Sequence, residues 1–236
     1  MRTPATTIAL IVSLTATGWA KRTPLSTPLE RAGFEKIERR HGVTVYAHKE
    51  SKALHFAGEA RFAVPPRQVQ QALLAYERQA GHIGRLSESR ILQRRPKTLV
   101  VYQRLDMPVI DDRDYTLKVR WGREGEDLWV TFRALGRGPA TRKGVVRVTR
   151  HGGSWQLRPV DGGRATFARY QMLMDLASWV PMWMARRSAG KEVVTVFVEF
   201  SRMMAADRKR GRAKTAWQPG SATPPGGADR TRAGSR

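Results

Sequence analysis

The sequence predicts an α+β fold in which helical segments pack against an antiparallel sheet. Short segments of alternating apolar and polar residues follow one another and are separated by Gly, Pro and Asp turns, and such meandering connections favour antiparallel pairing. A long helical pattern with one apolar side follows the last of these segments. The chain has 236 residues, 41% of them hydrophobic, which suits one domain with a sizeable core and terminal extensions.

The first half of the predicted fold combines two helices with four strands. Residues 28–40 have a helical pattern, and Pro65 and Pro66 begin a second helix that we expect to end at Gly81 or Gly84. The strands expected here are residues 42–50, 53–64, 87–93 and 98–106.

The clearest alternation in the chain is the stretch YTLKVRW, from Tyr115 to Trp121. Its odd-numbered residues are apolar and point one way, whereas Thr116, Lys118 and Arg120 point the other way, so one face is buried and the other meets water. Beyond the turn GREGED, residues 128–134 alternate again. The remaining strands are expected at 144–150, 154–160 and 164–174.

The last predicted element is an amphipathic helix that begins near Pro181, with Gly190 as a potential bend. Its apolar stripe consists of Met182, Ala185, Ala189, Val193, Val196 or Phe197, Phe200 and Met203. A sheet that wraps around such a helix gives an α+β fold with an apolar interior.

The two ends of the chain have compositions unlike a folded domain. Residues 1–20 combine an early Arg with a short apolar stretch from Ile8 to Leu14 and small residues up to Ala20. This pattern predicts a signal peptide cleaved after Ala20, hence an exported protein that is periplasmic or extracellular, with an uncleaved membrane anchor as the alternative. Residues 207–236 are rich in Gly, Pro, Ser and Arg and predict a disordered basic tail.

The formal net charge of +23 would attract phosphate-bearing partners, either nucleic acid or an anionic membrane surface. Export argues against nucleic acid, and aromatic residues are not interleaved with Arg on an evident exposed face. We therefore expect transient contact with anionic membranes, no nucleic-acid partner and a monomer.

The chain lacks the common motifs of catalysis and metal binding. It has no Cys and none of the nucleophile-elbow, HExxH, phosphate-loop or dinucleotide motifs, and its five His residues are scattered, so we expect no catalytic residue, metal or cofactor. Asp106, Asp111, Asp112 and Asp114 cluster around Arg113, but they do not fit a calcium loop. Arg113 would repel a cation, and its pairing with one of these aspartates is the favoured expectation.

Four stretches resemble START domains, the lipid-transfer modules related to steroidogenic acute regulatory protein. The stretch PVIDDRDYTLKVR resembles the Arg-Asp-aromatic start of a START strand. In the same order as in that family follow KGVVRV at Lys143 to Val148, WQLRP at Trp155 to Pro159 and DLASWVPMWM at Asp175 to Met184. The resemblance covers about residues 28–205.

The resemblance implies a helix-grip fold, a curved antiparallel sheet wrapped around a long C-terminal helix that encloses a hydrophobic tunnel. The loop from Met107 to Ile110 would lie over the tunnel mouth, anchored by Arg113 and Asp114. The side chains expected along the tunnel and its gate are Tyr102, Gln103, Met107, Val109, Ile110, Leu117, Val119, Trp121, Val130, Phe132, Tyr170, Met172, Met174, Met182, Val193, Phe197 and Phe200. The alternative for this apolar set is an ordinary filled core.

One position departs from the sterol-binding members of that family, which carry a basic residue in the tunnel. The matching position here is Val119, and Gln103 falls near the place of its acidic partner, so sterol specificity is not implied.

Three functions remain open from the sequence. The favoured one is non-enzymatic binding and transfer of one hydrophobic ligand, a phospholipid or a sterol-like lipid, with the C-terminal helix and a loop as the gate. The second is a polyketide cyclase or aromatase on the same fold, with Tyr102, Tyr115 and Tyr170 as the plausible acids; a contact between Tyr and His or Asp in the pocket would favour it. Binding of nucleic acid is the third.

Overall fold

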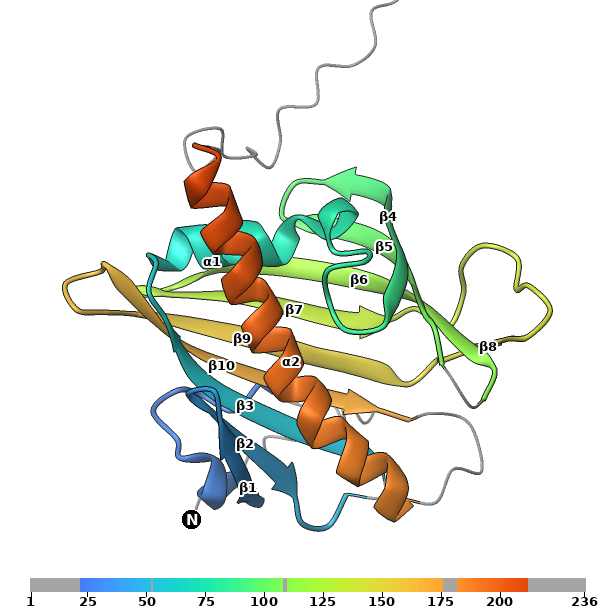
Figure 1. The fold of residues 1–236 in the computed structure, drawn as a ribbon, viewed down its shortest axis with the longest axis horizontal. Coiled ribbons are helices and arrows are strands. Elements are labelled where there is room, and N and C mark those ends of the chain that lie inside the picture. The colour runs from blue at the N-terminus through green and yellow to red at the C-terminus, as the bar shows by residue number, and fades with distance from the viewer. Residues whose placement is uncertain (1–21, 52, 108–109, 176–181, 212–236) are drawn as a thin grey trace, which may run out of the picture.

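The computed structural model describes residues 22–211 except residues 52, 108–109 and 176–181. A curved sheet forms the body of the molecule, and a long helix lies across one of its faces (Figure 1). The elements of the first half are η1 (Leu29–Ala32), β1 (Phe34–Arg40), β2 (Val43–His48), β3 (Leu54–Phe62), α1 (Pro66–Leu74), η2 (Tyr76–Arg78), β4 (Leu86–Arg95) and β5 (Thr98–Leu105). Those of the second half are β6 (Asp112–Glu124), β7 (Asp127–Ala134), β8 (Val145–Arg147), β9 (His151–Val160), β10 (Ala165–Met174) and α2 (Met182–Lys209).

The main path of the sheet runs β1-β2-β3-β10-β9-β7-β6-β5-β4, and every pair along it is antiparallel. β10 lies beside β3, so the last strand joins the N-terminal strands to the meander that β4 begins. The helix-grip α+β fold predicted from the sequence is confirmed, because α2 packs across β3 and β2.

β8 departs from the predicted antiparallel pattern. It has three residues and pairs with β6 in parallel, from Asp112 opposite Val145 to Asp114 opposite Arg147. β7 ends at Ala134, opposite Leu117, so the first residues of β6 have no partner from β7. The returning chain supplies those hydrogen bonds through β8.

The helix predicted at residues 28–40 is wrong. The chain there forms the short turn η1 and then β1, which pairs with β2. Gly33 and Gly42 bracket the strand with φ angles of 85° and 75°, values that glycine adopts at little cost. β1 is an edge strand with mostly exposed charged residues, so its polarity does not distinguish it from a solvated helix.

The second predicted helix ends earlier than expected. α1 stops at Leu74, and the short η2 follows. The buried Gln79 side chain donates a hydrogen bond from Nε2 to the Leu73 carbonyl oxygen at 2.9 Å, which satisfies one acceptor at the end of α1. The chain from Gln79 to Arg85 then crosses toward α2 and β4.

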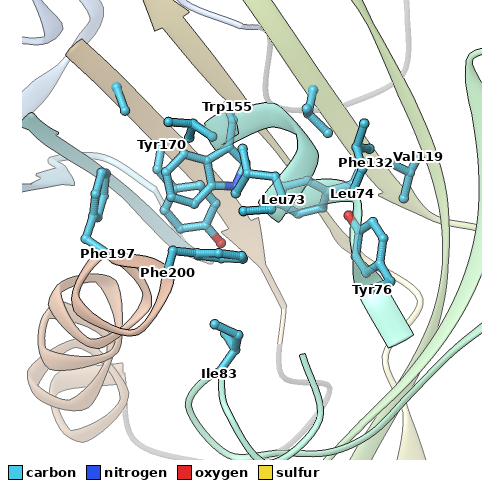
Figure 2. Packing of buried hydrophobic residues seen from close by; sticks show 14 of the residues in the cluster. Leu73, Leu74, Tyr76, Ile83, Val119, Phe132, Trp155, Tyr170, Phe197 and Phe200 are labelled. Carbon is cyan, nitrogen blue, oxygen red and sulfur yellow. The ribbon is translucent and has the colours of Figure 1, made fainter. Parts of the chain in front are cut away.

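α2 packs against the sheet at a glycine. A Cβ atom on Gly58 of β3 would lie 2.6 Å from Cγ1 of Val193 and 2.7 Å from Cε2 of Phe197, so only glycine allows this approach. Trp155 and Tyr170 continue the contact, with 4.5 Å between their ring centroids and 5.0 Å from Trp155 to Phe197 (Figure 2). No helix in the described ranges combines the length and apolarity needed to cross a membrane.

The N-terminal segment is bound to the sheet face opposite α2. Arg169 and Gln171 point to that outer face, because Tyr170 between them faces α2. Gln171 exchanges two hydrogen bonds of 3.0 Å with Thr23, and Arg169 donates to the carbonyl oxygens of Pro24 and Thr27 at 2.9 Å each. The chain therefore enters the domain along the outer face.

We predict opposite effects for two glycine substitutions. Gly58→Ala places a methyl group against Val193 and Phe197 and should lower the free energy of unfolding by about 1–3 kcal/mol. Gly190→Ala on α2 meets its first neighbour, Cδ1 of Ile37, at 3.5 Å and should raise stability by up to about 1 kcal/mol through helix propensity. Urea unfolding of both variants measures the difference, and equal effects would contradict the close approach at Gly58.

Candidate ligand-binding cavity

A cavity of about 300 Å³ lies between the inner face of the sheet, α2 and the segment before β4. Figure 2 shows Phe200, Ile83 and Tyr76 around one open space, with Trp155 and Tyr170 beside it. Eight of the residues predicted for the tunnel line this cavity, namely Gln103, Met107, Leu117, Phe132, Tyr170, Met172, Met174 and Phe200.

The cavity occupies only part of the predicted apolar interior. On β6 it is lined by Arg113, Tyr115 and Leu117, whereas Val119 and Trp121, further along the same face, belong to filled core. α1 covers that end of the sheet, where Gln70 bonds the carbonyl oxygens at the ends of β6 and β7. The other predicted residues that lie in the core and not on the cavity wall are Val130, Val193 and Phe197.

Tyr102 does not belong to the predicted tunnel. It points to the outer face, where its hydroxyl donates to Oδ2 of Asp114 at 3.3 Å and Arg90 lies 5.0 Å above its ring. Its neighbour Gln103 lines the cavity, and successive residues of a strand point to opposite faces. Tyr102 and Gln103 could therefore not both face the ligand.

The predicted gate residues have mixed outcomes. Met107 lines the cavity, and its backbone N–H donates to Oδ1 of Asp112 at 3.1 Å, which closes the loop between them. Ile110 is half-buried away from the cavity lining. Val109 and the side chain of Met182 lie outside the described residues.

Arg113 and Asp114 anchor different segments. Arg113 faces the cavity and donates to the carbonyl oxygens of Asp111 and Asp112. Asp114 is fully buried on the outer side and accepts two hydrogen bonds, at 2.9 and 2.7 Å, from Arg147 of β8. Asp114, one of the aspartates considered as a partner for Arg113, pairs with Arg147 instead, since adjacent strand residues face opposite sides.

Thirteen cavity residues lie outside the set predicted for the tunnel. The segment before β4 contributes five of them, because nothing in its composition reveals that it crosses the sheet. His151 lies between the strands expected at 144–150 and 154–160, but it is the first residue of β9. The cavity residues outside the predicted set are Tyr76, Gln79, Ile83, Gly84, Arg85, Leu86, Leu105, Arg113, Tyr115, His151, Trp155, Glu192 and Val196.

Two amides form a polar corner of the cavity. Gln103 donates from Nε2 to Oε1 of Gln79 at 3.2 Å and to Oγ of Ser89 at 3.0 Å. Since Gln79 in turn bonds the end of α1, the corner ties β5, β4 and the segment after η2 together. A buried network whose members are bonded fixes one arrangement of these elements.

His151 and three tyrosines place polar atoms among apolar ones. His151 lies with its ring 4.8 Å from the Tyr115 ring and with Nδ1 3.2 Å from the Leu173 carbonyl oxygen. Burial lowers the pKa of His151 to about 4, although the Leu173 carbonyl partly offsets this. Burial likewise raises the pKa of Tyr76, Tyr115 and Tyr170, so at neutral pH all four rings are uncharged.

With a neutral ring, the Nδ1–H of His151 donates to the Leu173 carbonyl, which leaves Nε2 as an acceptor. The protonated phenols are donors. Within the described ranges no group of three or more His, Asp or Glu side chains is arranged to hold a metal ion. The wall therefore offers neutral hydrogen-bonding groups, the buried Arg113 and, at its exposed edge, Arg85 and Glu192 to whatever occupies the cavity.

These features define a class of protein, a helix-grip α+β domain with an internal cavity under its C-terminal helix. No protein-family model and no curated protein sequence matches the chain. A STAR-related lipid transfer protein fragment from Xanthomonas axonopodis superposes with a TM-score of 0.67 at 20% identity, covering 73% of this chain and 99% of that one.

Two human structures are similar as well. STARD10 gives a TM-score of 0.68 at 16% identity over 78% of this chain and 77% of that one. StAR-related lipid transfer protein 5 gives 0.63 at 14% identity over 75% and 88%. The chain thus has the START fold, as the sequence resemblance predicted.

The buried His151 predicts a loss of stability in acid. The pKa of about 4 in the folded state lies below the usual value of 6.5, so between pH 6.5 and pH 4 His151 binds a proton in the unfolded chain but not in the folded chain. Stability should therefore fall as the pH drops from 6.5 toward 4, by about 2 kcal/mol between pH 8 and pH 5 from this group.

The variant His151→Gln keeps a donor for the Leu173 carbonyl but does not titrate. In urea unfolding, its free energy of unfolding should therefore fall by about 2 kcal/mol less than that of wild type between pH 8 and pH 5. His82→Gln, at an exposed position, is the control. Equal pH dependence in the two variants would rule out a neutral buried His151.

Proposed function

We propose that the protein binds one hydrophobic ligand in this cavity and transfers it without covalent chemistry. The observation that carries the proposal is the cavity of about 300 Å³ between the sheet and α2, lined mainly by apolar and aromatic side chains. The similar structures are named as lipid transfer proteins, which supports a lipid as the ligand. Each 100 Å² of apolar ligand surface removed from water contributes ~2.5 kcal/mol, so apolar contact alone gives useful affinity.

The size and polarity of the cavity narrow the ligand. Its volume is at the low end for small-molecule sites, which favours a single acyl chain or a compact ring system over a two-chain phospholipid. The phenols, amides and His151 lie among apolar groups such as Met172, Met174 and Phe200. A ligand with one oxygen-bearing end and an apolar body would satisfy both.

We propose the segment from Gln79 to Leu86 as the gate, together with α2. Three contacts bind this segment, or Arg78 just before it, to the acidic side of that helix. Arg78 forms a bidentate pair with Asp207 at 2.6 and 2.9 Å, the Gly84 N–H donates to Glu199 at 2.5 Å, and Arg85 lies 3.6 Å from Glu192. Because these groups are partly exposed, the contacts are weak enough to open without unfolding the core.

The proposal predicts faster exchange when the gate contacts are removed. The double variant Glu192→Ala/Glu199→Ala should release a fluorescent fatty acid to acceptor vesicles ~10-fold faster, because two exposed contacts contribute about 1 kcal/mol or more together. Stopped-flow fluorescence measures the rate. Glu35→Ala/Glu126→Ala, which removes two exposed carboxylates elsewhere, is the charge-matched control. Unchanged release from the first variant would exclude this segment as the gate.

The proposed function is tested by native mass spectrometry of the protein purified without detergent, with organic extraction of what co-purifies. A stoichiometric lipid is expected. Val196→Trp fills the cavity from α2 and should reduce ligand occupancy at least ~10-fold, whereas Arg202→Trp adds the same ring on the exposed side of the helix and should not. If wild type retains nothing and takes up no lipid from vesicles, the carrier proposal fails.

The same spectrum tests export. We propose that the mature chain begins after Ala20 and acts in the periplasm or outside the cell, which the composition of residues 1–20 supports. The mass of the cleaved chain is expected. A full-length mass in a membrane fraction would favour the uncleaved anchor.

A cyclase-like enzyme is the second candidate, and the contact between Tyr115 and His151 inside the cavity favours it. A protonated phenol beside a neutral imidazole can give and take a proton on a bound polyketide chain. The chemical form of an extracted or added ligand distinguishes the two functions: a carrier returns it unchanged, and an enzyme returns it cyclised.

A further inference from the structure

A second hollow, of about 250 Å³, lies on the outer face of the sheet, across β6, β7 and β9. Four basic side chains line it: Arg22, Lys118, Arg120 and Arg133. We call it the outer-face groove. It lies on the opposite side of the sheet from α2 and the cavity, because Lys118 and Arg120 alternate with the inward residues Leu117 and Val119.

The strand register brings like charges together in this groove. Lys118 of β6 lies directly opposite Arg133 of β7, and Arg120 is the next outward residue beside Lys118. Like charges directly opposite each other destabilise a sheet. Of the nearby carboxylates, Glu124 pairs with Arg22 of the groove at 2.5 Å, and Asp127 pairs with Arg158 at 2.8 Å. An anion in the groove would lie beside the charges of Lys118 and Arg120.

The remaining lining suits an anion in size and hydrogen bonding. Gly152 lies opposite Arg133 and has no side chain to fill the space, and Ser154 lies opposite Thr131, so two hydroxyl groups share the floor. Guanidinium, ammonium and hydroxyl donors around one hollow are the groups that bind a phosphate.

One observation favours a membrane as the source of that phosphate. Arg22 lies 5.4 Å from the ring centroid of Trp129 on β7, and tryptophan prefers the interface between lipid and water.

We propose that the outer-face groove binds the phosphate of anionic phospholipid headgroups and docks the protein on anionic membranes by its outer face. Docking in this orientation leaves α2 and the gate segment on the side away from the bound membrane. The proposal does not depend on what the cavity holds.

Co-sedimentation with vesicles tests the proposal on the full chain. Wild type should bind vesicles that contain phosphatidylglycerol and not pure phosphatidylcholine vesicles, with an affinity that falls as salt rises. Lys118→Gln/Arg120→Gln/Arg133→Gln should weaken binding about 100-fold, at roughly fivefold for each basic residue. Lys36→Gln/Arg39→Gln/Arg40→Gln changes the same residue types on the exposed edge strand β1 and should change binding only a few-fold.

Other outcomes would overturn the proposal. Equal losses in both triple variants would show that net charge alone attracts the protein. If glycerol phosphate binds the groove but vesicles do not, the site is for a soluble phosphate, and if the first variant loses duplex DNA binding but keeps vesicle binding, the groove serves nucleic acid. Arg120→Glu is a single change at an exposed position and replaces the triple variant if that variant fails to fold. It should weaken binding to phosphatidylglycerol vesicles at least ~10-fold.

Discussion

The packing of α2 on the sheet at Gly58 is the contact on which the other features depend. Val193 and Phe197 form one ridge of the helix and lie against the glycine, whereas Glu192, Val196 and Phe200 form the adjacent ridge and face the cavity. Because one ridge is held close to β3, the other is held at a fixed height above β6, β7 and β9. The cavity is the space that this second ridge does not fill.

Charge is arranged differently on the two sides of the sheet. Inside, burial keeps His151 and the tyrosines uncharged, which avoids the large free energy of an isolated charge in an apolar site. Arg113 is the buried charge on the cavity wall, and carbonyl oxygens of its own loop solvate it, whereas the charged Arg85 and Glu192 lie at the exposed edge. Outside, Lys118 and Arg120 remain in contact with water.

Only part of the cavity could be read from strand alternation. The stretch from Tyr115 to Trp121 showed which side of β6 is buried, and that side is the inner face. It could not show that Leu117 meets open space while Val119 meets packed core, because that depends on where α1 ends and on the path of the chain from Gln79 to Leu86. The prediction of a helix at residues 28–40 was wrong for a related reason, since an exposed edge strand and a solvated helix can share one composition.

The sequence by itself determined the antiparallel sheet, its long amphipathic closing helix and the resemblance to START domains, because hydrophobic periodicity and short motifs are local properties of the chain. It also specified the buried face of β6 and the basic composition of the opposite face. The tertiary structure decided which residues share the cavity, the separation of Arg113 from Asp114 and the register that sets Lys118 opposite Arg133. Those pairings join residues far apart in the chain, and they follow from the packing of α2 and the order of the strands, which no local pattern records.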